Sequence, residues 1–291
     1  LNKFRGDAQL LAPGPQMLQD LTGVPTVATL PMWWQHGLPE EDGVFDDRSR
    51  SSGAVTKTIA VIAYPRLSNL DEFQPLKNIP GVRLLWARSP ADLAGLQATD
   101  WVILPGSKHT SSDLAWLRAQ GLDQAIAHHA GNRGMVLGVC GGLQMLGEAL
   151  IDPHGIDGNG PGLGLLSLVT VFEENKTVQH SRARFEALRG PWAALSGVQV
   201  QGYEIHHGQT SARADMTAAG DAVLAVMPGG LAWQNDAGNV LGIYLHGMFE
   251  DPDVLKAMFG ASATTLDSVF DGLADYIGQH FDKALLESLL A

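Results

Sequence analysis

The single cysteine of the chain lies in a cluster of glycines that is typical of a catalytic thiol. Cys140 follows the apolar run Met135–Val139 and is flanked by Gly138, Gly141 and Gly142. The spacing Gly-x-Cys-x-Gly has the form of a nucleophile elbow with cysteine in place of serine, because small residues allow strained backbone angles and a close approach of the substrate. The helix expected after it would favour the thiolate through its N-terminal dipole. The alternative interpretation is a buried structural cysteine.

A cysteine nucleophile needs a base that takes its proton and returns it to a leaving group. Among the ten histidines, His246 is the best placed, because it directly follows the apolar run Val240–Leu245 and should stand at a strand end. His206, which follows Tyr203-Glu204-Ile205, is the second candidate. A single histidine taken alone is more often a surface residue or a satisfied core residue, so both assignments are hypotheses.

The oxyanion of an acyl-transfer intermediate needs backbone donors. One candidate donor is the N–H of Gly141, directly after the nucleophile, and the other is that of Gly106 in the segment Pro105-Gly106-Ser107. An ordinary turn is the alternative interpretation of this segment. Its expected position beside Cys140, at the same edge of a sheet, favours a function.

Runs of β-forming residues alternate with helical patterns in the middle of the chain. Strands are expected at 58–63, 82–86, 101–104 and 136–139, and helices at 114–117 and 121–130. This alternation predicts an α/β fold in which a parallel sheet carries helices on both faces. Ligands bind such sheets beyond the C-terminal ends of the strands, which is where Gly106 and Cys140 are expected.

The two ends of the chain and its last third have a different character. Antiparallel strands are expected at 169–172, 182–185, 198–202, 223–227, 231–234 and 240–245, after a turn-rich loop at 152–164. Apolar residues three or four apart between 266 and 289 predict an amphipathic helix that is broken near Gly278. The first 50 residues suggest a short helix broken at Pro13, a strand at 24–31 and a Ser-rich linker at 46–53.

Composition excludes several classes of partner. The formal net charge of -12 argues against nucleic acid and anionic membranes, and no apolar run approaches the roughly 20 residues of a membrane span. One cysteine rules out an internal disulfide, which favours a cytoplasmic location. No metal site and no signal peptide are predicted. The chain opens at Leu1-Asn2-Lys3 without an initiator Met, so we expect a piece of a longer protein.

Several motifs, taken together and in order, resemble the cobyric acid synthase family. They are Leu104–Lys108 with Asp113–Leu117, Gly138–Gly147, Gly202–His206 and Tyr244–Gly247. Two further segments, Asn2–Asp7 and Pro39–Asp42, resemble the end of that family's ATP-dependent P-loop synthetase domain. The resemblance implies three parts. Residues 1–50 would be the synthetase remnant and linker, 57–255 a class I glutamine amidotransferase domain with a flavodoxin-like mixed sheet, and 256–291 a C-terminal helical segment.

The resemblance also implies a reaction. Glutamine would be hydrolysed through a glutamyl thioester, and the ammonia would pass to a synthetase domain, outside this chain, that uses ATP and Mg. The acceptor would be a corrinoid of the cobyrinic acid a,c-diamide type, on the way to cobalamin. By motif matching, Cys140 is the nucleophile and His246 the base, while Gln144, Tyr203 and His206 are assigned to glutamine binding.

Two departures from the family pattern matter. Class I amidotransferases usually carry a Glu two residues after the His, and here that position is Met248; the resemblance places the chain in the branch that lacks this Glu. We hypothesise that Glu204 orients His246 instead, with substrate binding or a structural role as the alternative. The second departure is an absent phosphate loop, since Gly53–Thr58 lacks its second glycine. We therefore expect no cofactor on this chain, which alone would at most hydrolyse glutamine.

Two other functions remain open from the sequence. Cobyrinic acid a,c-diamide synthase and the amidotransferase that acts on lipid II share the Cys/His pair, although Tyr-Glu-Ile-His and Glu-Glu-Asp favour the cobyric acid synthase family. A non-catalytic module on an amidotransferase-like fold is the alternative from a different class, and it predicts no thiol reactivity.

Overall fold

The computed structural model describes residues 1–7, 9–33, 54–212, 222–260 and 266–290. The chain divides into two compact units, Pro39–Ala263 and a smaller one made of Leu1–Leu38 with Thr264–Ala291. The predicted linker at 46–53 and the acidic residues at 39–42 lie outside the described residues. The assignment of residues 1–50 to a synthetase domain therefore stays a prediction.

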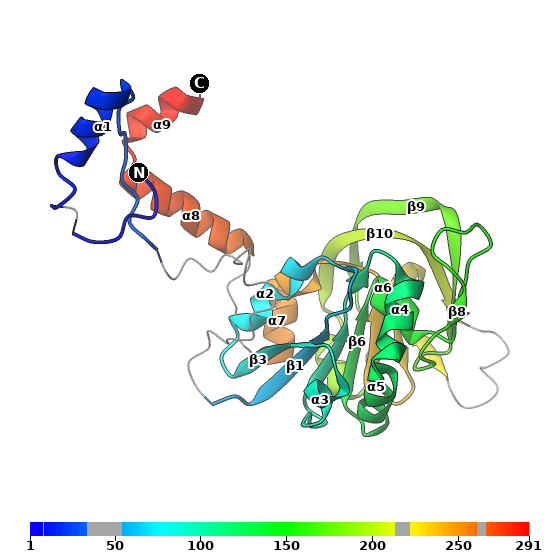
Figure 1. The fold of residues 1–291 in the computed structure, drawn as a ribbon. Coiled ribbons are helices and arrows are strands. Elements are labelled where there is room, and N and C mark those ends of the chain that lie inside the picture. The colour runs from blue at the N-terminus through cyan, green and yellow to red at the C-terminus, as the bar shows by residue number, and fades with distance from the viewer. Residues whose placement is uncertain (8, 34–53, 213–221, 261–265, 291) are drawn as a thin grey trace. The chain divides into compact units, whose positions relative to one another are not determined.

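A seven-stranded mixed sheet forms the centre of the larger unit, in the order β11-β12-β13-β6-β4-β1-β3 (Figure 1). Neighbouring strands pair in parallel from β13 to β3. At the other edge, β12 pairs antiparallel with both β13 and β11. The strands are β1 (Lys57–Ile62), β3 (Val82–Ala87), β4 (Trp101–Leu104), β6 (Met135–Val139), β11 (Val223–Ala225), β12 (Ala232–Asn235) and β13 (Val240–Ile243). The predicted mixed α/β sheet is confirmed.

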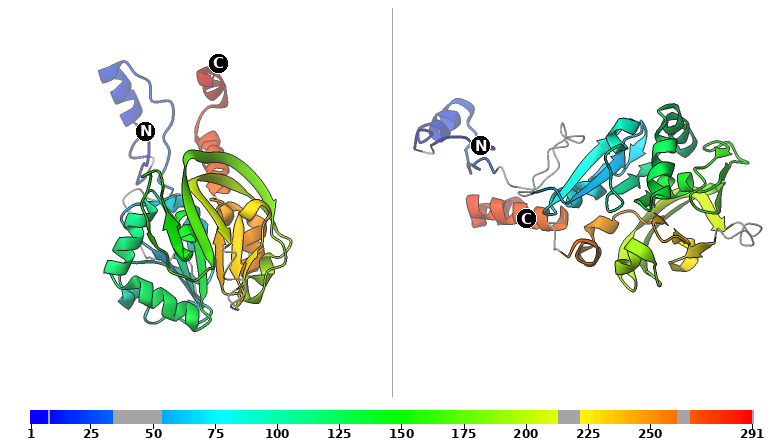
Figure 2. Two further views of the ribbon diagram at one scale, coloured as in Figure 1. Left: turned by 90° about the vertical axis from the view of Figure 1, so that its right-hand side faces the viewer. Right: turned by 90° about the horizontal axis from the view of Figure 1, so that it is seen from below.

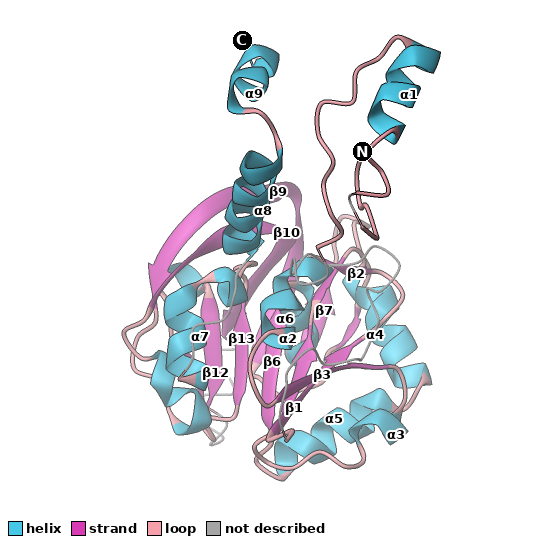
Figure 3. Cartoon of the chain, turned by 90° about the vertical axis from the view of Figure 1, so that its left-hand side faces the viewer, coloured by secondary structure: helices cyan, strands magenta, loops and turns pink. Residues whose placement is uncertain are grey.

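Helices cover both faces of this sheet (Figures 2 and 3). In β1, Ile59 and Val61 belong to one apolar cluster, while Ala60 and Ile62 belong to the other, as the alternation of side chains along a strand requires. The first face packs against η2 (Leu70–Phe73), α2 (Gln74–Lys77), η3 (Gly190–Leu195), η5 (Met248–Glu250) and α7 (Pro252–Phe259). The second packs against α3 (Pro90–Leu93), α4 (Thr110–Ala119), α5 (Leu122–Gly131) and α6 (Gly141–Leu146).

A long antiparallel ribbon of β9 (Leu168–Arg184) and β10 (Gln199–Ala212) arches beside the main sheet (Figure 1). It belongs to a four-stranded sheet in the order β10-β9-β7-β8, with β7 (Ala149–Ile151) and β8 (Gly160–Pro161). The predicted strands 169–172 and 182–185 are thus parts of one strand. The prediction failed because most side chains between them are exposed and polar, so the strand is held by pairing with β10 and not by an apolar face.

Two short elements near Cys140 also differ from expectation. The helix after the cysteine ends at Leu146, and Ala149 belongs to β7. Gly106–Ser107, for which an ordinary turn was the alternative interpretation, forms the short strand β5, which pairs with β2 (Leu67–Ser68). A hydrogen bond from the Tyr64 hydroxyl to the carbonyl of Pro105 holds the chain in front of β5.

The smaller unit contains three helices among its described residues, α1 (Gly14–Thr22), α8 (Leu266–His280) and α9 (Lys283–Leu290). Tyr276 ties its two chain segments together, because its ring stacks on Trp33 at 5.0 Å and its hydroxyl donates to the carbonyl of Pro31 at 2.7 Å. The strand predicted at 24–31 is reduced to an isolated bridge between Pro31 and Phe4, with backbone hydrogen bonds that join Leu30 to Leu1 and Phe4. The C-terminal helix breaks after His280, close to the predicted position near Gly278. Within the described part of the chain, no helix is long and apolar enough to cross a membrane.

Candidate active site

Cys140 lies on a sharp turn between the end of β6 and the start of α6. Its backbone angles are φ 50° and ψ -106°, which is a strained conformation for a residue with a side chain. The turn is possible because its neighbours are glycines: a Cβ on Gly142 would lie 1.9 Å from the carbonyl oxygen of Leu104, and one on Gly138 would lie 2.7 Å from the carbonyl carbon of Gly142. The glycines therefore let β4, β6 and α6 approach closely enough to form the elbow.

A substitution of Gly142 tests this account. Since an alanine Cβ would meet backbone and not a flexible side chain, Gly142→Ala should lower the free energy of unfolding by about 3 kcal/mol or more. Thermal and denaturant unfolding measure this loss. Gly95→Ala is the matched control, because a Cβ there meets nothing within 4 Å. Equal stability of the two variants would contradict the close approach of Gly142 to β4.

His246 is held against Cys140 by Glu72, a residue that the sequence did not single out. Its Nδ1 donates to Oε1 of Glu72 at 3.0 Å, and the other carboxylate oxygen accepts the N–H of Gly247 at 3.0 Å. Because the carboxylate accepts a hydrogen bond from Nδ1–H, the other ring nitrogen, Nε2, is free to act on the thiol. The side chains of His246 and Cys140 are in hydrogen-bonding contact. Cys140, His246 and Glu72 therefore form a candidate triad, with the arrangement that a nucleophile, a base and an orienting carboxylate would need.

The pKa of His246 is raised to about 10. Burial by itself would lower it, but hydrogen bonds to Cys140 and Glu72, together with the negative charges of these groups, more than offset burial. The arrangement thus favours a protonated imidazole at neutral pH.

The hypothesis that Glu204 orients His246 is wrong. Glu204 accepts hydrogen bonds from the amide of Gln179 at 2.8 Å, from the hydroxyl of Ser181 and from Nε2 of His206 at 3.3 Å. Its pKa is lowered, because these hydrogen bonds outweigh burial, which acts in the opposite direction. Tyr203, the neighbour of Glu204 in β10, pairs with His246 in an isolated bridge, but the Glu204 carboxylate itself is bonded to Gln179 and Ser181 of β9. Glu204 consequently fixes the ribbon and not the base.

The structure gives the three predicted glutamine-binding residues different surroundings. Gln144 lines the cavity at Cys140, but its amide already bonds to the hydroxyl of Thr110 at 3.1 Å and to that of Tyr244 at 3.4 Å. His206 also lines the cavity and stacks on Tyr244 at 3.9 Å. Tyr203 instead stacks on His246 at 5.2 Å. Tyr203 thus contacts the base, whereas Gln144 and His206 contact the space in front of the thiol.

The two predicted oxyanion donors lie on either side of this space. Gly141 opens α6 directly after the nucleophile, and Gly106 begins β5. A Cβ on Gly106 would lie 2.7 Å from Cε1 of His246, and one on Gly141 would lie 2.9 Å from the backbone nitrogen of Ser107. Both glycines are therefore packed against the reacting groups, and the proposal that their N–H groups bind the oxyanion is compatible with this packing.

A cavity of about 510 Å³ opens in front of Cys140 and His246. The ribbon contributes Ile205 to the wall of the cavity. The carbonyl oxygen of Ile205 accepts a hydrogen bond from the Cys140 thiol at 3.8 Å. Other walls come from β5, α4, α6 and the loop before β8. The cavity thus combines a nucleophile, a base and glycine backbone donors, which is the set that acyl transfer requires.

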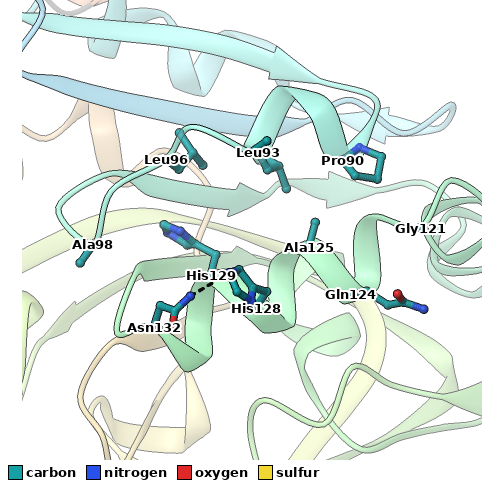
Figure 4. Close-up of a pocket in the computed structure, with 11 residues that line it drawn as sticks. Pro90, Leu93, Leu96, Ala98, Gly121, Gln124, Ala125, His128, His129 and Asn132 are labelled. Atoms are coloured by element: carbon teal, nitrogen blue, oxygen red, sulfur yellow. Dashed lines mark hydrogen bonds between the residues drawn. The ribbon is translucent and has the colours of Figure 1, made fainter.

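A second cavity, of about 560 Å³, lies between α3 and α5 (Figure 4). Leu93, Leu96 and Ala125 give it an apolar wall, and the amide of Asn132 bonds to Nε2 of His128 at 2.9 Å. His129 is buried here, and burial lowers its pKa. Among the described residues that line this cavity there is no nucleophilic side chain, so it is not the candidate active site.

Glu72 is the member of the candidate triad that the sequence analysis did not single out. It lies between Asp71 and Phe73 in the segment Leu70–Phe73. Because another carboxylate directly precedes it, the sequence carries no local signal that sets Glu72 apart. Its burial, and the need of a buried carboxylate for a partner, appear only in the structure.

An α/β fold that brings a cysteine, a histidine and a carboxylate together at one sheet edge is typical of enzymes that use a cysteine nucleophile. The chain belongs to the CobB/CobQ-like glutamine amidotransferase domain family, whose model matches residues 58–254. This match confirms the family resemblance and indicates an enzyme of the amidotransferase class.

Curated relatives and a solved structure agree with this assignment. Cobyric acid synthase from Polaromonas naphthalenivorans is 79% identical over all of this chain and 60% of that protein. The one from Variovorax paradoxus is 71% identical over the same shares of the two chains. The chain thus spans about 60% of the length of these curated relatives. The structure of PurLQS from Thermotoga maritima shares the fold, with a TM-score of 0.51 and 17% identity over 70% of this chain and 98% of that one.

Proposed function

We propose that this chain performs the glutaminase step of a glutamine-dependent amidation in cobalamin biosynthesis. The observation that carries the proposal is the triad of Cys140, His246 and Glu72 at the edge of the cavity. It is supported by the family of residues 58–254 and by relatives that are named cobyric acid synthase.

The proposed reaction proceeds through a thioester. The thiolate of Cys140 attacks the side-chain amide carbon of glutamine, and the N–H groups of Gly141 and Gly106 stabilise the resulting oxyanion. His246 transfers its Nε2 proton to the nitrogen, the C–N bond breaks, and ammonia leaves. His246 then takes a proton from water, which attacks the thioester and releases glutamate and the cysteine. Glu72 holds the imidazole in orientation throughout, and each atom of glutamine and water appears in the two products.

The acceptor half of the reaction is also part of the proposal. We infer that ammonia is used by an ATP- and Mg-dependent synthetase domain, which corresponds to the part of the relatives that this chain does not span, and that the acceptor is a corrinoid carboxylate. The inference follows from the names of the relatives. A cytoplasmic location remains proposed on the basis of the unpaired Cys140.

A glutamine-analogue diazoketone tests the glutaminase step without any acceptor. The reagent should alkylate Cys140, and mass spectrometry should find one adduct per chain that is absent in Cys140→Ser. A chain that leaves the reagent unreacted, in the presence and absence of the synthetase domain, would favour a non-catalytic module.

The acceptor is tested in a polypeptide of the relatives' full length. With glutamine, ATP and Mg, amidation of cobyrinic acid a,c-diamide is expected, while cobyrinic acid and lipid II should remain unmodified. Amidation of either of the latter two would assign the chain to the corresponding related system. The isolated chain should release ammonia from glutamine but form no corrinoid amide.

A further inference from the structure

Three charged side chains line the same cavity as the triad, and the reaction itself uses none of them. Asp157 lies on one wall, in the loop before β8, and Lys108 and Lys176 also line the cavity. A glutamine molecule with its amide at Cys140 would still have to place an α-ammonium and an α-carboxylate. These groups are costly to desolvate unless partners of opposite charge receive them.

Asp157 is held rigidly with its carboxylate at the start of α4. Its Oδ2 accepts the N–H of Thr110 at 2.8 Å, its Oδ1 accepts that of Ser111 at 2.7 Å, and Nδ1 of His109 lies 3.5 Å from Oδ1. Its own N–H donates to Asp152 at 2.8 Å. A carboxylate offers about four acceptor positions. Oδ2 can therefore accept a hydrogen bond from a further charged donor and keep its bond to the N–H of Thr110.

Lys176 reaches the cavity because the ribbon is irregular at that point. The pairing of β10 with β9 shifts between His206 and Gly208, so residues 173–176 fall outside the regular ladder. Bulges of this kind re-aim side chains beside active sites. Lys108 follows β5 directly, and its N–H donates to the carbonyl of Arg66 at 2.8 Å. Both ammonium groups therefore come from segments that adjoin the reacting residues.

The polar residues nearer the thiol have little capacity left for these charges. The amide of Gln144 is engaged by Thr110 and Tyr244. The two ring nitrogens of His206 are engaged by the carbonyl of Gly208 at 2.8 Å and by Glu204. The charged residues that line the cavity, and not these buried groups, are thus the partners available to a zwitterion.

We propose that Asp157 binds the α-ammonium of the substrate, and that Lys176 with Lys108 binds its α-carboxylate, so that the site selects a free α-amino acid. This inference rests on the proposed function, since it assigns the other end of glutamine. It makes Asp157 and Lys176 specificity-determining residues. They are not members of the catalytic triad.

Binding of three ligands to a Cys140→Ala chain separates recognition from structure. The ligands are L-glutamine, glutaramate, which lacks the α-ammonium, and 4-aminobutanamide, which lacks the α-carboxylate. Isothermal titration calorimetry should show that Asp157→Asn weakens the binding of glutamine and 4-aminobutanamide by ~10-fold or more but leaves the affinity for glutaramate unchanged. Lys176→Gln should weaken the binding of glutamine and glutaramate by a similar factor but leave the affinity for 4-aminobutanamide unchanged.

Two control variants accompany the test. Asp123→Asn removes a carboxylate on α5, and Arg182→Gln changes the same strand as Lys176, at positions outside the cavity lining. Both should keep the selectivity of the parent chain, and thermal unfolding confirms that each variant is folded. The inference would be overturned if a variant of Asp157 or Lys176 weakened the binding of all three ligands equally, or changed the binding of none. A parent chain that binds with this selectivity but never hydrolyses glutamine would instead overturn the proposed function and leave the inference standing.

Discussion

Replacing Cys140 with serine is expected to reduce the rate of glutamine hydrolysis by ~10⁴-fold or more, while binding of glutamine is retained. A serine hydroxyl is a much weaker acid than a thiol, so it needs a neutral imidazole to take its proton. In the variant Glu72 still raises the pKa of His246, and a protonated imidazole cannot deprotonate an alcohol.

Release of ammonia and glutamate measures this loss. His246→Asn should cause a loss of the same order, and the double variant should be no slower than either single one, because the two residues act as a unit. His128→Asn, in the second cavity, is the control and should leave the rate unchanged. A Cys140→Ser chain with an undiminished rate would rule out the thioester.

Glu72→Gln is expected to lower kcat by ~10²–10⁴-fold with a small change in KM, as when the orienting carboxylate of a triad becomes an amide. A glutamine side chain can satisfy only one of the two donors that Glu72 now accepts, His246 Nδ1 and the N–H of Gly247. Glu204→Gln is the matched control, because it removes a buried carboxylate of similar exposure that does not contact the base. Equal effects of the two substitutions on kcat would contradict the assignment of Glu72.

The same variant has a distinct dependence on pH. Loss of Glu72 removes one of the contacts that raise the pKa of His246, so the pKa of His246 should fall, which an NMR titration of its imidazole measures. The folded pKa of about 10 lies above the unfolded value of about 6.5. Its contribution to stability is therefore complete below pH 6.5 and is lost as the pH rises through 10. Denaturant unfolding should show Glu72→Gln less stable than the parent at pH 7, with the difference narrowing toward pH 10.

The catalytic pair could be proposed from the sequence because both residues carry local signals. Gly138 and Gly142 bracket Cys140, and an apolar run ends directly before His246. Both features mark the end of a strand, and parallel strands align their C-terminal ends at one edge of a sheet. The sequence alone could therefore predict that Cys140 and His246 lie close together, as the pairing of β6 with β13 requires. The same logic placed Gly106 at that edge.

The orienting carboxylate could not be proposed in this way. Glu72 and His246 are separated by 174 positions, and their contact depends on η2 and η5 packing together on one face of the sheet. Glu204 was the more attractive candidate because it lies two residues before His206 in a recognisable motif. A motif records which residues occur together along the chain, whereas the pairing of β10 with β9 decides which way each side chain points.

The α/β class, a candidate thiol with its candidate base, and the family could all be inferred from the chain alone, because short-range features encode them: the spacing of glycines, strand periodicity and ordered motifs. Three relations appear only in the folded molecule. They are the contact of Glu72 with His246, the bonds of Glu204 to the ribbon, and the cavity that Asp157 and Lys176 share with Cys140. These relations join residues from different strands and loops. Their contacts follow from how the sheet, its covering helices and the ribbon pack, and local sequence carries no direct record of that packing.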